Sequence, residues 1–159
     1  MKAVDERRGN GVREILFRGM RTDGVWVYGS YVECRASWYR KAPHKAWIVT
    51  DARSNGGWFA INGRYAVINE TVGQYAGVID KNGRRVFEGD IVLTKYGRAC
   101  RVEYRETPQF KGFDLTPVEM KGRRNNADAP TAWDLWAAEN IEVIGNVHED
   151  EEEGLGIRD

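Results

Sequence analysis

Short apolar runs rich in Val, Ile, Tyr, Phe and Trp recur along most of the chain, separated by glycines that stand beside Asn or Asp. This pattern is typical of antiparallel β-hairpins, because Asn-Gly and Asp-Gly pairs reach the positive φ angles of a two-residue primed turn at low cost. The sequence predicts four such turns, each followed directly by a candidate strand: Asp23-Gly24, Asn55-Gly56-Gly57, Asn62-Gly63 and Asn82-Gly83.

Alternation of apolar and charged positions adds strands in the second half of the chain. Within Ala99 to Arg105, Cys100, Val102 and Tyr104 alternate with three charged residues, which predicts a half-buried strand. Ile91–Leu93 reads as a more fully buried strand, and Ile141–Val147 as another, with a bulge expected at Gly145. Helical spacing is clearest over 131–140, where we expect one short helix.

Composition narrows the class of protein. The chain has 159 residues, of which 42% are hydrophobic, so it can form a core, and it has no apolar run long enough for a membrane span. We therefore expect a cytoplasmic protein without a signal peptide. Its 24 basic and 24 acidic residues cancel, which removes the simplest argument for nucleic-acid binding.

The charges are nevertheless unevenly distributed. Residues 1–50 hold ten Lys or Arg against five Asp or Glu, whereas residues 140–159 hold one against seven. The last part, 150–159, contains too little apolar surface to fold and is predicted to be an acidic disordered tail. We also expect residues 1–12 to be flexible.

Few residues could carry chemistry. No glycine-rich phosphate loop or nucleophile elbow is present, and two cysteines with two histidines give few possible metal ligands. Asp80, Glu88 and Asp90 could form an acid pair or metal site, but turn formation is the favoured interpretation. Cys34 and Cys100 are interpreted as core residues. No catalytic residue, cofactor or metal is predicted.

Aromatic residues mixed with cations mark one candidate binding surface. Such a mixture suits single-stranded nucleic acid, whereas large aromatic side chains also fill the cores and the homo-oligomer interfaces of small β proteins. The residues that could form this surface are Arg35, Trp38, Arg40, Lys41, Trp47 and Trp58.

The stretch from Glu70 to Val92, ETVGQYAGVIDKNGRRVFEGDIV, resembles the signature of the YopX family of phage and prophage proteins, approximately T-V-G-Q-[YF]-T-G-L-x-D-K-N-G-x-x-I-[YF]-E-G-D-I-V. Its departures include Ala76, where Thr is usual, and Val78, where Leu is usual. Three further pieces resemble the family in order: 13–19, 26–29 and 142–149. The family-motif residues are Thr71, Gly73, Gln74, Tyr75, Gly77, Asp80, Gly83, Glu88, Gly89 and Asp90.

This resemblance implies a mainly β protein encoded in phage or prophage regions, with a C-terminal SH3-like barrel and no established activity. The expected organisation is an N-terminal antiparallel β region over 13–75 and the barrel over 76–149. The motif itself is explained by turns and core residues, so it implies no catalytic residues.

Three functions remain open. The first is a non-enzymatic accessory protein that forms a homo-oligomer or binds a phage or host protein. The second is a nucleic-acid-binding SH3-like module, which requires the cations of 35–45 and 123–124 to gather on one face. The third is an endoribonuclease of the MazF toxin type, which shares a barrel with a Gly-Asp-Ile-Val strand entry. In those toxins the motif opens the chain, whereas here it begins at Gly89.

Overall fold

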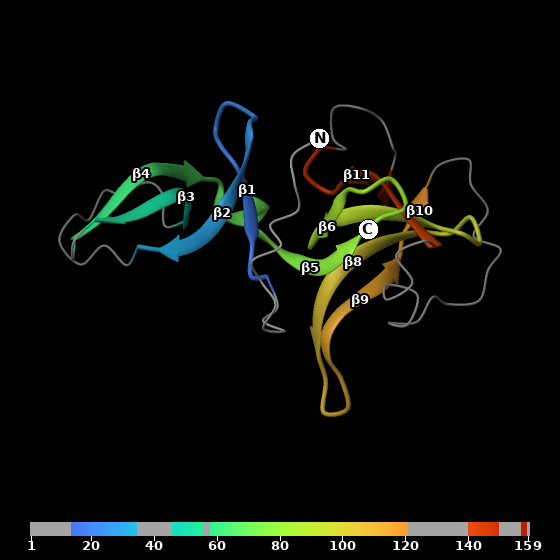
Figure 1. Ribbon diagram of the computed structural model, residues 1–159. Coiled ribbons are helices and arrows are strands. Elements are labelled where there is room, and N and C mark those ends of the chain that lie inside the picture. Colours follow the sequence, from blue (N-terminus) through green and yellow to red (C-terminus); the bar gives the residue numbers. More distant parts are fainter. Residues whose placement is uncertain (1–13, 35–45, 56–57, 121–139, 150–156, 159) are drawn as a thin grey trace.

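The protein is mainly β, with the described strands arranged in two larger antiparallel sheets and one two-stranded sheet (Figure 1). A computed structural model describes residues 14–34, 46–55, 58–120, 140–149 and 157–158. The six-stranded N-terminal sheet has the order β4-β3-β2-β1-β5-β6, and the four-stranded C-terminal sheet has the order β11-β7-β8-β9. The strands are β1 (Phe17–Met20), β2 (Trp26–Glu33), β3 (Ala46–Asn55), β4 (Trp58–Val67), β5 (Gly73–Ile79), β6 (Arg85–Phe87), β7 (Asp90–Thr94), β8 (Ala99–Glu106), β9 (Lys111–Pro117), β10 (Glu119–Met120), β11 (Ile141–Asn146) and β12 (Ile157–Arg158), with a 3-10 turn η1 (Asn69–Thr71) before β5.

The N-terminal sheet curls around its own small core. The buried members of that core are Val27, Ala46, Ile48 and Val67. The curl brings the end of β4 back to β1, where the Ile68 N–H donates to the Met20 carbonyl oxygen at 2.8 Å. Beyond this core, β2, β3 and β4 extend away from the C-terminal sheet, on the left in Figure 1. We call residues 30–33, 46–55 and 58–66 the arm; its base, which includes Ala46 and Ile48, belongs to the core.

The predicted turns have different outcomes. Gly24 and Gly83 both have positive φ, at +79° and +81°, and connect β1 to β2 and β5 to β6 as expected. Asn55 pairs with Trp58, so the turn predicted at 55–57 is confirmed. The turn predicted at Asn62-Gly63 is wrong. Gly63 lies inside β4 opposite Asp51, where the pairing with β3 shifts register, because the chain has already reversed direction a few residues earlier.

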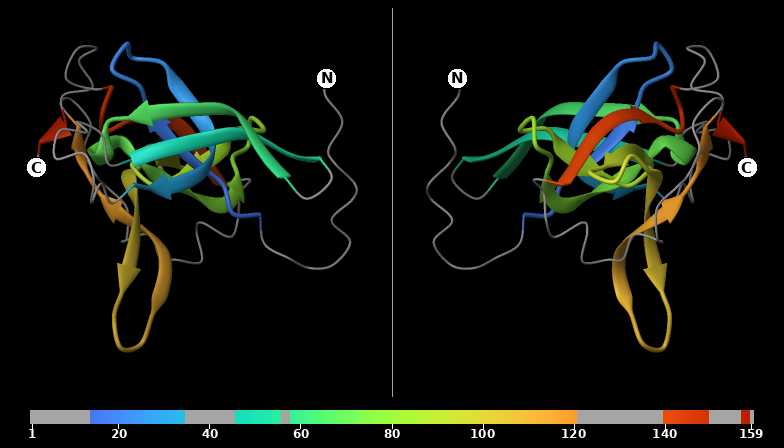
Figure 2. Two further views of the ribbon diagram at one scale, coloured as in Figure 1. Left: turned by 90° about the vertical axis from the view of Figure 1, so that its left-hand side faces the viewer. Right: turned by 90° about the vertical axis from the view of Figure 1, so that its right-hand side faces the viewer.

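The C-terminal sheet is centred on β7, which pairs with both β8 and β11. Its main core consists of Val86, Val92, Cys100, Val102, Leu115 and Ile141. The alternation predicted from residue 99 onwards is confirmed as far as Val102, whereas Tyr104 is 48% exposed. Tyr104 is exposed because the β8–β9 hairpin projects beyond the body of the sheet (Figures 1 and 2). The bulge expected near Gly145 is present as a register shift between β11 and β7.

Other expectations need correction. The two sheets of the described residues form no closed barrel. Cys34 is exposed rather than a core residue, since it follows the far end of β2, outside the core. Residues 157–158, predicted to belong to a disordered tail, form β12 and pair with β10. Apart from Asn140, the helix expected over 131–140 lies outside the described residues.

Within the described ranges, no helix has both the length and the apolar character needed to cross a membrane.

Candidate functional site

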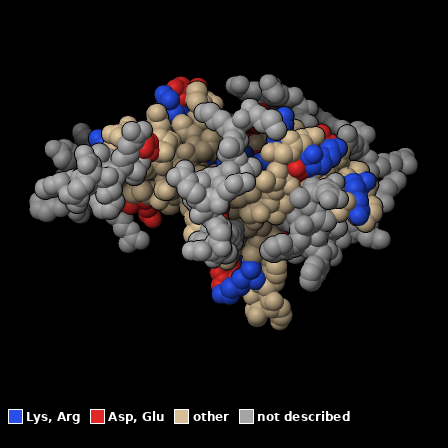
Figure 3. Space-filling view, viewed as in Figure 1, with Lys and Arg blue, Asp and Glu red and all other residues tan. Residues whose placement is uncertain are grey.

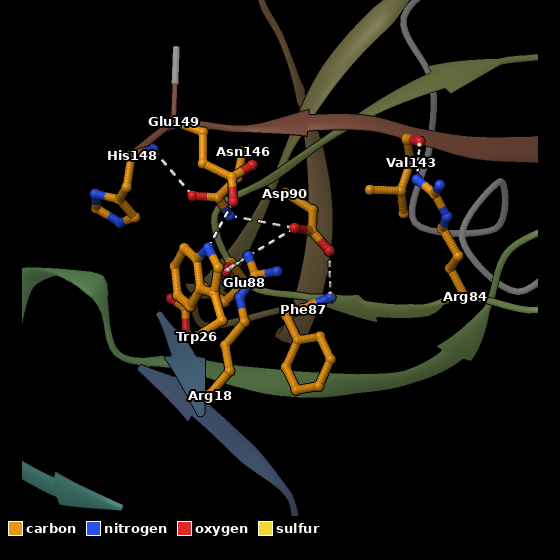
Figure 4. A network of polar contacts seen from close by, with 10 residues as sticks. All are labelled: Arg18, Trp26, Arg84, Phe87, Glu88, Asp90, Val143, Asn146, His148 and Glu149. Atoms are coloured by element: carbon orange, nitrogen blue, oxygen red, sulfur yellow. Dashed lines mark hydrogen bonds and ion pairs between the residues drawn. The ribbon is translucent and has the colours of Figure 1, made fainter. Parts of the chain in front are cut away.

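A buried ion pair connects the two sheets. Arg18 in β1 and Asp90 at the start of β7 approach to 2.6 Å, and their side chains are 9% and 1% exposed. Side chains from β2, β6 and the end of β11 surround this pair (Figure 4). We define the junction cluster as Arg18, Trp26, Phe87, Asp90, Asn146, His148 and Glu149.

Asp90 is positioned by the turn before it. Gly89 has φ +83°, a conformation that favours glycine, and this turn leads the chain into β7. The Asp90 carboxylate then accepts hydrogen bonds from the Phe87 N–H at 2.8 Å and from Asn146 Nδ2 at 3.2 Å. Both carboxylate oxygens therefore have donors from the protein itself, in addition to Arg18.

Arg18 is held by aromatic rings as well as by charge. Its guanidinium carbon lies 4.7 Å from the centre of the Trp26 ring and 5.0 Å from that of Phe87. It also donates to the Glu88 carbonyl oxygen at 3.2 Å. Cation–π contacts strengthen when they are desolvated, so the two rings stabilise a cation that burial alone would destabilise.

The chain that follows β11 closes one side of the cluster. Trp26 Nε1 donates to Glu149 Oε1 at 2.5 Å, and the His148 N–H donates to Asn146 Oδ1 at 2.9 Å. Burial lowers the pKa of His148, and the Arg18 cation lowers it further. Burial also raises the pKa of Asp90, while the charge of Arg18 opposes that rise.

The chemistry of the cluster is that of a structural connection. The Asp90 oxygens are already occupied by an arginine, a backbone amide and a side-chain amide. In the part of the chain that the structure describes, no three His, Cys, Asp or Glu side chains gather in a way that could hold a metal ion. The arrangement fixes the angle between the sheets.

Asp80 performs a similar task within the C-terminal half. Its Oδ1 accepts from the N–H groups of Asn82 and Arg84 at 2.9 and 2.8 Å, which shapes the β5–β6 turn. Its Oδ2 accepts from the Val143 N–H at 3.0 Å, which ties that turn to β11. Burial acts to raise the pKa of Asp80, but the three backbone donors outweigh it and the pKa is lowered. These bonds give Asp80 the turn-forming role that was the favoured interpretation from the sequence.

The other family-motif residues also have structural positions. Thr71 is buried in η1, where its hydroxyl accepts from the Met20 N–H at 2.8 Å. The Gln74 carbonyl oxygen accepts from the Glu88 N–H at 2.9 Å. Tyr75 is buried with its ring 5.6 Å from that of Phe87, and Gly77 has φ +85° where the β5–β6 pairing shifts register.

Replacing Gly73 with alanine is expected to destabilise the fold by roughly 1–3 kcal/mol. A Cβ atom at this position would lie 2.5 Å from the Glu88 carbonyl oxygen, a backbone atom that cannot move aside alone. Urea denaturation of Gly73→Ala and of the wild type measures the effect. Gln74→Ala is the control at the next position, because it keeps the backbone carbonyl oxygen that accepts from the Glu88 N–H. Equal stability of Gly73→Ala and wild type would show that the two strands separate at little cost.

The predicted aromatic and cationic surface is only partly described. Arg35, Trp38, Arg40 and Lys41 lie outside the described residues. Trp47 is half-buried in β3, between Val32 of β2 and Ala66 of β4. Trp58 begins β4 opposite Asn55. The structure thus places two of the six predicted residues on the arm.

Sequence reasoning did not identify the junction cluster as a site. Arg18, Trp26, Asn146 and His148 all lie in the three outlying pieces that resemble the YopX family, and Asp90 lies in the main motif. The convergence of all four pieces on one place was the signal that could have revealed it. Alternation patterns could not do so, because they assign a residue to a face without naming its partner.

Comparison with known proteins agrees with this geometry. The family model described as YopX protein matches residues 20–153, which include every strand from β2 to β11. The chain belongs to the YopX family. No curated protein matches the chain. Among solved structures, the YopX family chain is similar to the crystal structure of protein EF1440 from Enterococcus faecalis, with a TM-score of 0.52 and 19% identity. That match covers 89% of this chain and 99% of the other, and it shows a shared fold.

Proposed function

We propose that this YopX protein is a non-enzymatic phage or prophage accessory protein that acts by assembling with further copies of itself. The observation that carries the proposal is the arm, which exposes apolar side chains on both of its faces. An exposed apolar patch of this kind favours a protein interface.

The two faces of the arm follow from its strand register. Tyr31, Ile48 and Tyr65 lie opposite one another and share one face. Ile48 is fully buried, whereas the two tyrosines are each 36% exposed. Val32 lies on the other face beside Trp47 and is 41% exposed. An isolated sheet normally has one apolar face and one polar face, so apolar exposure on both faces indicates a surface that a partner covers.

A second copy of the chain suits this surface. The protein carries no net charge, so two copies meet without long-range repulsion. Each half of the chain also has only a small buried core, which association would extend. A phage or host protein is the other possible occupant, and it would leave the purified protein monomeric.

The described surface gives less support to nucleic-acid binding. Its basic side chains mostly pair with carboxylates, as in Arg21–Asp23, Arg85–Glu14 and Arg105–Asp114. On the face drawn in Figure 3, blue and red atoms lie side by side at the top and at the bottom of the molecule. This alternative otherwise rests on the analogy with SH3-like modules that the sequence suggested, and the described sheets form no closed barrel.

Replacing Val32 with glutamate is expected to weaken self-association, because a charge would enter the apolar surface of the arm. The wild type should elute above the monomer mass of 18.1 kDa in size-exclusion chromatography with light scattering, and Val32→Glu should shift toward that mass. Val25→Glu is the matched control, since Val25 is 49% exposed but lies in the β1–β2 turn, outside the arm.

A wild type that remains monomeric throughout the micromolar range would contradict self-assembly. Salt-dependent binding of labelled single-stranded DNA or RNA to such a monomer would favour the nucleic-acid alternative instead.

A further inference from the structure

β4 is an unusually open edge strand. It is ten residues long, ends the N-terminal sheet, and among the described residues pairs only with β3. It contains no proline, and its one charged residue is Arg64. Ile61, Asn62, Arg64 and Tyr65 are all exposed. Natural proteins usually protect such an edge with proline, several charges or a short strand, because its backbone groups can pair with another chain.

We propose that β4 pairs antiparallel with β4 of a second copy, across a twofold axis at Gly63. This inference rests on the proposed self-assembly and names the surface that performs it. The pairing would extend the N-terminal sheet continuously from one protomer into its partner.

The sequence of β4 is self-complementary about Gly63. In this register Ile61 of one protomer lies opposite Tyr65 of the other, and the symmetry makes this contact twice. Alternation along β4 assigns both side chains to one face, at 51% and 36% exposure, so the pairing would cover this exposed apolar surface. The pairing of β4 with β3 shifts register between them. The Arg21 guanidinium lies 5.3 Å from the Tyr65 ring centre and helps to hold that ring in place.

The single charge of β4, on Arg64, favours this register over the two neighbouring registers of the β4–β4 pairing. Side chains alternate between the two faces of a strand. A different register therefore keeps the same faces aligned only if one β4 strand moves by two residues relative to the other. A shift in one direction places Arg64 opposite Arg64, a like-charge pair that destabilises a sheet. A shift in the other direction places Ile61 opposite Gly63 and loses the apolar contact. At the proposed register Arg64 faces Asn62, whose side-chain oxygen can accept a hydrogen bond from it.

The test is a charge swap measured by sedimentation equilibrium of the full chain. Asn62→Arg puts two like-charge pairs across the axis and is expected to weaken dimerisation roughly tenfold. Asn62→Arg combined with Arg64→Glu restores opposite charges at the same positions and should recover most of the wild-type affinity. Gln109→Arg is the control, because it adds the same charge at an exposed position of the β8–β9 turn, outside the arm.

The possible outcomes separate this inference from the proposed function. Loss with Asn62→Arg and recovery in the double variant support β4 pairing at Gly63. An oligomer that Val32→Glu weakens but both Asn62 variants leave unchanged would overturn the β4 register and retain self-assembly through the arm. A wild-type monomer at all concentrations would overturn both.

Discussion

Replacing Asp90 with alanine is expected to lower the free energy of unfolding by about 3–5 kcal/mol. The substitution leaves the Arg18 guanidinium, 9% exposed, without its carboxylate. It also removes the acceptor used by the Phe87 N–H and by Asn146 Nδ2. Breaking one side of a buried ion pair costs more than the pair contributes, because the remaining charge stays buried. Urea denaturation followed by circular dichroism measures the loss.

Two variants separate the buried pair from ordinary surface charge. Arg18→Met with Asp90→Leu removes both charges and should cost clearly less than Asp90→Ala alone, since no uncompensated charge remains. Lys111→Ala breaks the Lys111–Glu106 pair, in which the two side chains are 65% and 59% exposed, and should cost at most about 1 kcal/mol. A double variant that is less stable than Asp90→Ala would show that Arg18 stabilises the junction mainly through its ring contacts.

The junction cluster also bears on assembly. β1 pairs with both β2 and β5, so it connects the arm to the strands that lead into the C-terminal half. The Arg18–Asp90 pair and the Trp26–Glu149 hydrogen bond add side-chain connections between β1–β2 and the C-terminal sheet. In the assembly proposed above, the cluster would therefore set the direction in which each protomer presents β4 to a second copy.

Local features of this fold could be predicted from the sequence, and long-range ones could not. The turns at Gly24 and Gly83 and the buried face of β8 depend on residues within a few positions of one another. Arg18 and Asp90 are 72 positions apart, and both read in isolation as ordinary exposed charges. Asn62-Gly63 shows the opposite failure. Its local preference for a turn is real, but pairing with β3 keeps it extended.

The same contrast applies to the candidate site. The turn role of Asp80 could be predicted because two of its three donors lie within four positions of it. Its third donor, from Val143, belongs to a strand more than sixty positions away. Alternation identified Cys100 and Val102 as core residues, but it gave no sign that Tyr104 would lie on a projecting hairpin.

Replacing Asp80 with alanine is expected to cost about 3 kcal/mol, because three backbone N–H groups lose their acceptor. Asp80→Asn should cost only about 1–2 kcal/mol. One asparagine oxygen can still accept from Asn82 and Arg84, whereas the amide nitrogen would face the Val143 N–H and cannot accept from it. Chemical denaturation of both variants at neutral pH measures the difference. Equal losses would mean that the bond to β11, rather than the turn, carries the stabilisation.

The pH dependence of stability gives an independent check on Asp80. Its pKa is lowered in the folded protein from the ordinary value of 3.8, so the folded state holds the ionised form more strongly than the unfolded chain does. The resulting stabilisation is complete above about pH 5 and is lost as pH falls through 3.8 toward the lower folded value. Asp80→Asn cannot titrate, so its stability deficit relative to wild type should shrink over that range. A deficit that stays constant from pH 6 to about pH 2 would show that the three donors do not favour the ionised carboxylate.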